Sequence, residues 1–132
     1  MAAYAASATP EATVLEGKTV ACGHRDRLDM ECPVNDTGGW LWSCNFAVRT
    51  TVFAALAGFD EAFPGPAMED IDLHRRLKSA GHRVEFLPAA LVRHPWRMRR
   101  GMAFGRLHAA SVARYVAKHP VEGARFGCLS QS

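Results

Sequence analysis

Three carboxylates stand within four residues of one another, at Glu69, Asp70 and Asp72. Like charges this close repel, so they need positive or hydrogen-bonding surroundings. They follow the Pro/Gly-rich segment 64–66 and open residues 69–80, where apolar residues recur with helical spacing. A helix N-terminus favours each acidic residue by about 0.3–1 kcal/mol, which accounts for one or two of them. A third is typical of a general base or a metal-facing site, so a structural and a catalytic interpretation both stay open.

Two further polar side chains lie beside apolar segments. His94 follows a short apolar stretch, and Pro95 restricts its backbone. The imidazole is either a structural group or a ligand. Asn45 interrupts the aromatic-rich run 40–48, which is typical of a buried strand. An unsatisfied buried amide costs about 1–3 kcal/mol, so Asn45 either ties a neighbouring loop or contacts a ligand.

Positive charge gathers in the C-terminal third of the chain. The net charge is +3, but residues 1–85 hold 8 Lys and Arg against 12 Asp and Glu, while residues 86–132 hold 8 against Glu122 alone. A solvated helix face is the simplest interpretation. Phosphate binding or docking on an anionic membrane is the sharper one, and Trp96 beside Arg97 suits such an interface. Nucleic acid is disfavoured because no recognition motif accompanies the charge.

Length and composition bound the class of protein. The 132 residues are 48% hydrophobic and 22% charged, which is typical of one globular domain or part of one. No apolar run approaches the roughly 18 residues that cross a bilayer, and the first residues lack the pattern of a secretory signal. The four cysteines form no C-x-x-C pair, which argues against a zinc site and favours a reducing, cytoplasmic setting.

Local patterns predict alternating strands and helices, and therefore an α/β fold. Helices are expected at residues 2–8, 51–57, 69–80 and 96–118. Strands are expected at residues 19–22, 40–48 and 82–87, the last closed by Pro88, with a further apolar stretch at 89–92. Gly58 and Gly81 stand where left-handed residues would end two of the helices. The polar segment 23–39 is predicted to be a loop long enough to have a function.

Five short motifs follow one another in a fixed order. They are N-F-A-V-R from Asn45, A-G-F-D-E-A-F from Ala57, E-D-I-D-L from Glu69, V-E-F-L-P from Val84 and V-R-H from Val92. Together they resemble the C-terminal, acceptor-side half of family 2 glycosyltransferases of the GT-A fold. The resemblance implies a partial GT-A fold: a few-stranded mixed sheet with flanking helices and a basic C-terminal helix. Residues 1–95 would form the half-domain and residues 96–132 a basic helical extension.

The resemblance also implies a reaction. Such enzymes move a sugar from a nucleotide-diphospho-sugar to an acceptor hydroxyl with inversion. Asp70 matches the general base that deprotonates the acceptor, and Glu69 would orient it or contact the acceptor. A divalent cation, Mn²⁺ or Mg²⁺, would offset charge on the departing diphosphate. His94 matches a histidine that binds this metal or the diphosphate.

Three residues are expected to contact substrate by the same resemblance. Asn45 matches an asparagine that lines the cleft between donor and acceptor, and Trp42 and Asp72 join it as substrate-binding candidates. The family often has Gly two residues before the asparagine, where this chain has Ser43. The acceptor would be a glycan or a lipid-linked molecule. The Q-x-x-R-W motif of processive synthases is absent, which favours transfer of a single sugar.

The nucleotide-binding half of the family, which ends in a D-x-D metal motif, would lie upstream of residue 1. A separate chain could supply it, and without it the 40–48 strand would lack partners and the chain would be marginally stable. The alternative function is a non-catalytic module that docks on an anionic membrane or a partner chain through its basic helix. The expected location is the cytoplasm or the inner face of its membrane.

Overall fold

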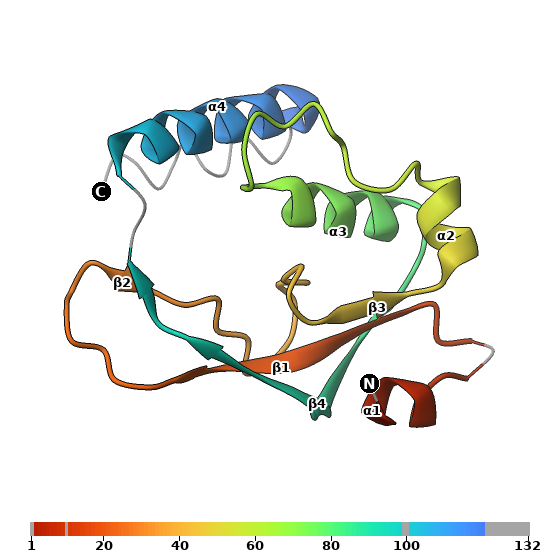
Figure 1. Cartoon of the computed structure of the whole chain (residues 1–132). Helices are drawn as coiled ribbons and strands as arrows, with labels where there is room; N and C mark the ends of the chain where they lie inside the picture. Colours follow the sequence, from red (N-terminus) through yellow and green to blue (C-terminus); the bar gives the residue numbers. More distant parts are fainter. Residues whose placement is uncertain (1, 10, 99–100, 121–132) are drawn as a thin grey trace.

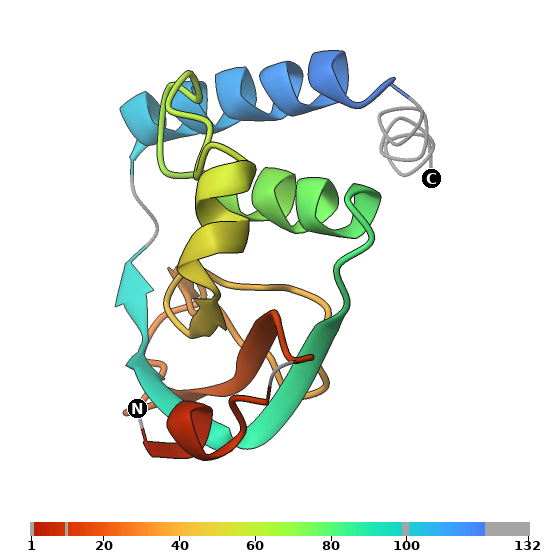
Figure 2. The same ribbon diagram turned by 90° about the vertical axis from the view of Figure 1, so that its right-hand side faces the viewer.

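A computed structural model of the chain describes residues 2–9, 11–98 and 101–120. Its elements along the chain are α1 (Ala2–Ala6), β1 (Val14–Cys22), β2 (Met30–Glu31), β3 (Phe46–Val48), α2 (Thr50–Ala55), α3 (Glu69–Ser79), β4 (Val84–Pro95), β5 (Arg97–Met98) and α4 (Met102–Lys118). The helix α3 lies over one side of a small sheet, α4 runs alongside α3 on the side away from the sheet, and α1 lies at the opposite end of this stack (Figures 1 and 2). None of the helices in the described ranges is long and apolar enough to cross a membrane.

The main sheet has three strands in the order β3-β1-β4. The central strand β1 pairs antiparallel with β3 and parallel with β4, and Val14 lies opposite both Val48 and Val84. This small mixed sheet with flanking helices agrees with the α/β class that the sequence predicts. Strand β1 starts five residues before the expected strand, at Val14, which is fully buried.

The aromatic-rich segment 40–48 is a strand only at its end, so the prediction of a strand over the whole segment is wrong. Leu41 has a left-handed φ of 48°, and the backbone N–H of Asn45 donates to the Trp42 carbonyl at 2.9 Å, which closes a turn. A strand cannot contain either feature. The segment is apolar because Leu41 enters the core, not because it is paired. Strand β3 pairs with β1, so the expectation that it lacks partners within this chain is also wrong.

The strand β4 is longer than predicted, because it continues through Pro88 to Pro95. Proline has no N–H to donate to a ladder, and the pairing with β1 shifts register between Gly17 and Thr19 to accommodate this stretch. The pairing resumes at Thr19 and Val92. The expectation of two separate apolar stretches is therefore wrong, since the chain absorbs the proline as an irregularity in one strand.

The other boundaries differ by less, with one exception. The first helices end at Ala6 and Ala55, slightly earlier than expected, and Gly58 and Gly81 have the predicted left-handed φ, 65° and 83°. The exception is α4, which begins at Met102 and not at residue 96. The preceding residues form β5, which pairs with β2 from the long polar loop.

The core lies between α3 and the sheet. Leu73 and Leu77, one turn apart on α3, are fully buried with Val14 and Leu41. Aromatic and branched side chains from β3, α2 and the loop after α2 pack around them. The predicted apolar face of the helix is thus the face that contacts the sheet. This packing places the N-terminus of α3, with its three acidic residues, at one edge of the core.

A substitution at Gly17 is expected to destabilise this core strongly. A Cβ there would lie 2.3 Å from the Ala90 carbonyl oxygen, 2.5 Å from Asn45 Nδ2 and 2.6 Å from the Tyr4 hydroxyl. Two of these groups help to hold β1 to its neighbours, and a Cβ would displace them. Gly17→Ala should therefore lower the free energy of unfolding by about 2–3 kcal/mol in urea titrations. The matched control is Gly105→Ala in α4, where a Cβ meets nothing within 4 Å. This substitution should raise the free energy of unfolding by about 0.5–1 kcal/mol, because alanine favours a helix more than glycine does. Equal effects at both sites would contradict this packing.

Candidate functional site

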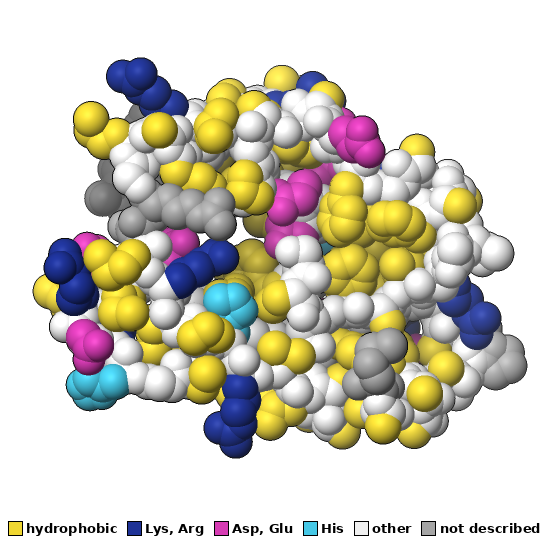
Figure 3. Space-filling model, in the orientation of Figure 1, with side chains coloured by type: hydrophobic (Ala, Val, Ile, Leu, Met, Phe, Trp, Pro, Cys, Tyr) yellow, Lys and Arg dark blue, Asp and Glu magenta, His cyan; other side chains and the backbone are white. Residues whose placement is uncertain are grey.

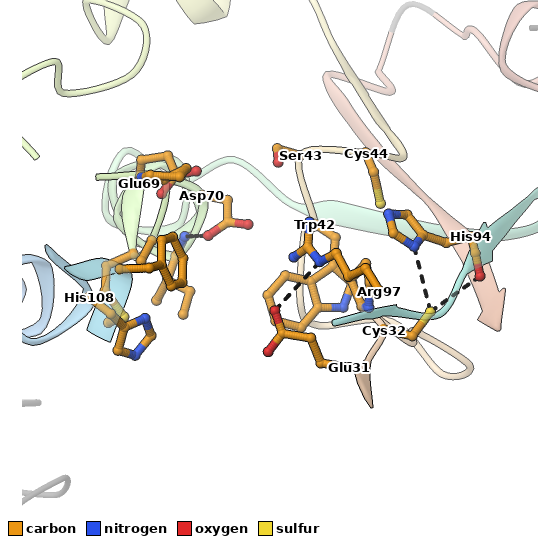
Figure 4. A pocket seen from close by; sticks show the side chains of 16 residues that line it. Glu31, Cys32, Trp42, Ser43, Cys44, Glu69, Asp70, His94, Arg97 and His108 are labelled. Atoms are coloured by element: carbon orange, nitrogen blue, oxygen red, sulfur yellow. Dashed lines mark hydrogen bonds and ion pairs between the residues drawn. The ribbon is translucent and has the colours of Figure 1, made fainter. Parts of the chain in front are cut away.

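A cavity of about 400 Å³ opens at the N-terminus of α3. Its walls come from the first turn of α3, the loop before β3, the end of β4, the segment around β2 and β5, and α4 (Figure 4). Figure 3 shows acidic side chains on one side of the hollow and a basic and a histidine side chain across from them. Two lining residues do not follow this division, because Glu31 lies beside Arg97 and His108 lies on the side of Glu69 and Asp70 (Figure 4). Four of the predicted site residues line this cavity: Trp42, Glu69, Asp70 and His94. Asn45 and Asp72 do not line it.

Asp70 is the most buried carboxylate in the cavity wall, with 8% of its surface exposed. Met68, the residue before the helix, adopts a left-handed φ of 71° and directs the chain into α3. Burial raises the pKa of Asp70, although backbone N–H groups of Ile71, at 2.9 Å, and of Ser43 donate to the carboxylate and lower it in part. The net upward shift makes Asp70 a stronger base than an exposed aspartate.

Glu69 lies beside Asp70 on the same wall and is half-buried. Its Oε2 is buried and has no hydrogen-bond partner within the described ranges. Burial, and next the charge of Asp70, raise its pKa, while its own backbone N–H opposes the shift. Buried carboxylate oxygens are nearly always paired. An orphaned one at a cavity wall therefore indicates an atom that a ligand can satisfy.

His94 faces the acidic wall from the end of β4 (Figure 4). Its Nδ1 lies 2.8 Å from the Pro95 carbonyl oxygen, and Cys32 Sγ lies 3.8 Å from the same nitrogen. A carbonyl oxygen only accepts hydrogen bonds, so Nδ1 carries the proton in this arrangement. The neutral ring then has its lone pair on Nε2, the nitrogen that is left to accept a proton or bind a ligand. The Cys32 thiol donates to the His94 carbonyl at 3.4 Å and helps to hold the segment.

A comparison with protein families matches residues 41–119 to the family described as glycosyltransferase like family 2. This chain belongs to that family. The match contains the whole acidic wall, His94 and α4. The predicted resemblance is thus confirmed at the level of the family.

Two curated relatives are similar to this family 2 chain. They are the validoxylamine A glucosyltransferases of Streptomyces hygroscopicus subsp. jinggangensis (strain 5008) and of Streptomyces hygroscopicus subsp. limoneus. Each is 33% identical over 88 residues, which is 61% of this chain. The chain spans about a fifth of the length of these relatives, 19% and 18%. No solved structure matches the chain.

Asn45 in this family 2 chain ties elements together. Its Nδ2 donates to the carbonyls of Lys18 and Ala90, both at 2.9 Å, and its Oδ1 accepts from the Tyr4 hydroxyl at 2.7 Å. The amide thus joins β1, β4 and α1 to the turn before β3, and 6% of the residue is exposed. Of the two interpretations that the sequence left open, the geometry matches the one in which Asn45 ties a neighbouring loop.

Asp72 does not line the cavity and lies among the hydrogen-bonding groups of Arg76, Lys118 and His119. It is fully buried and lies 2.7 Å from Arg76 Nε, 2.8 Å from Lys118 Nζ and 2.8 Å from His119 Nε2. Burial alone would raise its pKa, but the hydrogen bonds from Lys118, His119 and Arg76 outweigh burial and hold the pKa below its usual range. Asp72 therefore fastens the end of α4 to α3 and to the loop after α2.

A second acidic residue anchors the same end of α4. Asp60 accepts two hydrogen bonds from Arg114, at 3.0 and 2.9 Å, and one from Lys118 at 2.8 Å. Both cations also lie over the ring of Phe63. Two of the basic residues of the predicted basic helix are thus used inside the molecule, and α4 is held where Phe104 and His108 can line the cavity.

Four titratable residues of the cavity were not predicted from the sequence as site residues: Glu31, Cys32, Cys44 and His108. A fifth, Arg97, was noted only as part of the basic segment, and its guanidinium lies 3.5 Å from the Glu31 carboxylate. Glu31 and Arg97 face each other only because β2 pairs with β5. No sequence spacing announces this pairing, since each strand has two residues. His108 is brought in by the anchoring of α4.

The metal that the resemblance implies is not matched by the side chains present. Within the residues that the structure describes, no group of three or more His, Cys, Asp and Glu is placed to hold a metal ion. The side chain that contacts His94 Nδ1 is the Cys32 thiol, at 3.8 Å, whereas Mn²⁺ and Mg²⁺ prefer oxygen ligands. The described residues therefore do not form a divalent-cation site of their own. A metal role for His94 stays a prediction.

Proposed function

We propose that this chain forms the acceptor side of an inverting glycosyltransferase site, with Asp70 as the general base. One observation carries the proposal: a nearly buried carboxylate with a raised pKa stands in the wall of a cavity of about 400 Å³. A general base must be deprotonated at the working pH and still hold a proton well. Burial supplies the second property, and the hydrogen bonds from Ile71 and Ser43 preserve the first.

In the proposed reaction, Asp70 removes the proton of an acceptor hydroxyl while the oxygen of that hydroxyl attacks the anomeric carbon of the donor. The new bond forms between that oxygen and the anomeric carbon, and the bond from the carbon to the diphosphate oxygen breaks. Attack from the side opposite the leaving group inverts the configuration. Glu69 Oε2, which is buried without a described partner, would accept a hydrogen bond from a second hydroxyl of the acceptor.

The opposite wall of the cavity suits the departing diphosphate. Arg97 carries a permanent positive charge at the cavity wall, and a guanidinium binds two phosphate oxygens at once. His94 lies on the same side of the cavity and is the second residue that we propose to contact the diphosphate. In this arrangement Glu69 and Asp70 contact the acceptor, whereas Arg97, which also lies 3.5 Å from the Glu31 carboxylate, contacts the leaving group.

The donor we propose is a nucleoside-diphospho-glucose, because both curated relatives are named as glucosyltransferases. The test is to incubate the protein with UDP-glucose or GDP-glucose and a methyl pyranoside and to follow the anomeric proton of the product by NMR. The α-linked donor should give a β-linked product, with one nucleoside diphosphate released per bond formed. An α-linked product would contradict the proposal.

A further inference from the structure

Two indole rings stack beside the cavity. Trp40 and Trp42 are nearly parallel, with an interplanar angle of 6° and ring centroids 5.3 Å apart. Trp42 lines the cavity, whereas Trp40 does not and is 51% exposed. The indole Nε1 of Trp42 donates to the Val34 carbonyl at 3.0 Å, which fixes the ring from its polar edge. Trp42 is thus held by a hydrogen bond and by a stacked neighbour outside the cavity.

The turn that carries the two rings is fastened from below by a buried carboxylate. Glu16, 2% exposed in β1, accepts hydrogen bonds from Leu41 N at 2.8 Å, from Asn35 Nδ2 at 3.1 Å and from Gly39 N. Gly38 and Gly39 adopt φ of 84° and 98°, which other residues rarely do. A buried charge with three donors is a strong local restraint. The turn that carries Trp40 and Trp42 is therefore rigid.

This turn is continuous with the part of the cavity wall that carries Asp70. Ser43, the residue after Trp42, lines the same cavity as Asp70, and its backbone N–H lowers the pKa of the Asp70 carboxyl. The ring of Trp42 and the proposed general base, Asp70, thus line the same cavity. An acceptor whose hydroxyl reaches Asp70 must extend its remaining atoms along the cavity, where Trp42 offers a broad apolar surface.

We infer that Trp42 is the platform for the ring of the acceptor, and that the acceptor hydroxyl belongs to a pyranose. This inference rests on the proposed function and names its acceptor class. A pyranose presents C–H groups on one face and hydroxyls around its edge. The face of an indole is electron-rich and attracts such C–H groups, while the edge hydroxyls are left to Asp70 and Glu69. An acyclic alcohol has no flat face to place on the ring. Trp40 is a positioning residue that holds Trp42 in one orientation.

Binding of a probe sugar, without turnover, tests the inference. The experiment is saturation-transfer difference NMR with methyl β-D-glucopyranoside and with the acyclic hexitol sorbitol. The axial ring protons of the pyranoside should receive the strongest saturation, and sorbitol should bind at least about ten-fold more weakly, as expected for loss of one stacking contact. Equal binding of the two probes, or no binding of the pyranoside, would overturn the assignment.

Variants separate the platform from the fold and from the base. Trp42→Ala should weaken pyranoside binding about ten-fold, and Trp40→Ala, at a half-exposed residue outside the core, about three-fold. Trp96→Ala is the matched control, because Trp96 contacts Arg25 and does not line the cavity. Asp70→Asn should retain binding even if it has no activity, so failure of the base and failure of the platform are distinguishable. Unchanged binding in both Trp40→Ala and Trp42→Ala would refute the platform.

Discussion

Asp70→Asn is expected to reduce sugar transfer by about 10²–10⁴-fold, the range for loss of a general base. The amide oxygen of asparagine can still accept from the backbone N–H groups of Ile71 and Ser43, so the cavity should keep its shape. Donor and acceptor binding should change little, because the substitution removes proton acceptance and not surface. The measurement is the initial rate of nucleoside diphosphate release in the presence of acceptor.

The same variant should be more stable than the wild-type protein at neutral pH. Burial raises the pKa of Asp70 above that of the unfolded chain, so folding is favoured by its protonated form. That contribution is complete below the unfolded pKa and is lost as pH rises through the folded pKa. Removing the charge should therefore increase the free energy of unfolding at pH 7. A loss of stability together with a loss of activity would point to a structural role.

The pH profile supplies a further check on this prediction. Activity requires the deprotonated carboxylate, so the rate should fall as pH falls through the pKa of Asp70, which lies above the ordinary 3.8. Glu69→Gln is the matched neighbour, since it also removes a carboxylate from the wall. It should reduce activity less than Asp70→Asn does and leave the acid limb of the profile in place. A larger loss in Glu69→Gln would assign the base to Glu69.

Asp72→Ala is expected to cause the largest loss of stability, about 3–5 kcal/mol. The substitution leaves Arg76, Lys118 and His119 without their shared buried anion. Arg76 also donates to the carbonyls of Leu56 and Gly58, so the loop after α2 should loosen as well. The measurement is the free energy of unfolding in urea, together with hydrogen exchange along α4.

The pH dependence of stability follows from the same carboxylate. The hydrogen bonds from its partners hold the pKa of Asp72 below its unfolded value, so its contribution is present above the unfolded pKa, near 3.9, and is lost as pH falls through the folded pKa. Wild-type stability should thus decline in acid more steeply than that of Asp72→Ala. Asp26→Ala, at a carboxylate with 70% of its side chain exposed, is the control and should change stability by less than about 0.5 kcal/mol. Parallel pH curves for the wild type and Asp72→Ala would contradict this account.

The chain's own residues determine its periodic elements and its family. The helix over residues 69–79 was predictable because its apolar residues recur every three to four positions, and Gly81 ends it in a left-handed conformation. The order of short motifs indicated the family because local sequence is itself the signal, and the family comparison confirms it. The three adjacent acids also marked the right helix terminus.

Only the tertiary structure decided what each acid does and which residues join them. Asp70 and Asp72 are two residues apart in one helix, so their side chains point in different directions, one toward the cavity and one toward the end of α4. Nothing in their local sequence says which direction meets a cavity, because that depends on where β4 and α4 pack. For the same reason, the sequence did not predict that His108 lines the cavity or that Glu31 pairs with Arg97. Contacts between distant segments also explain why residues 40–45 form the turn that carries the two tryptophans and not the expected strand. Short-range patterns set the elements, whereas contacts between distant segments set the surroundings of each side chain.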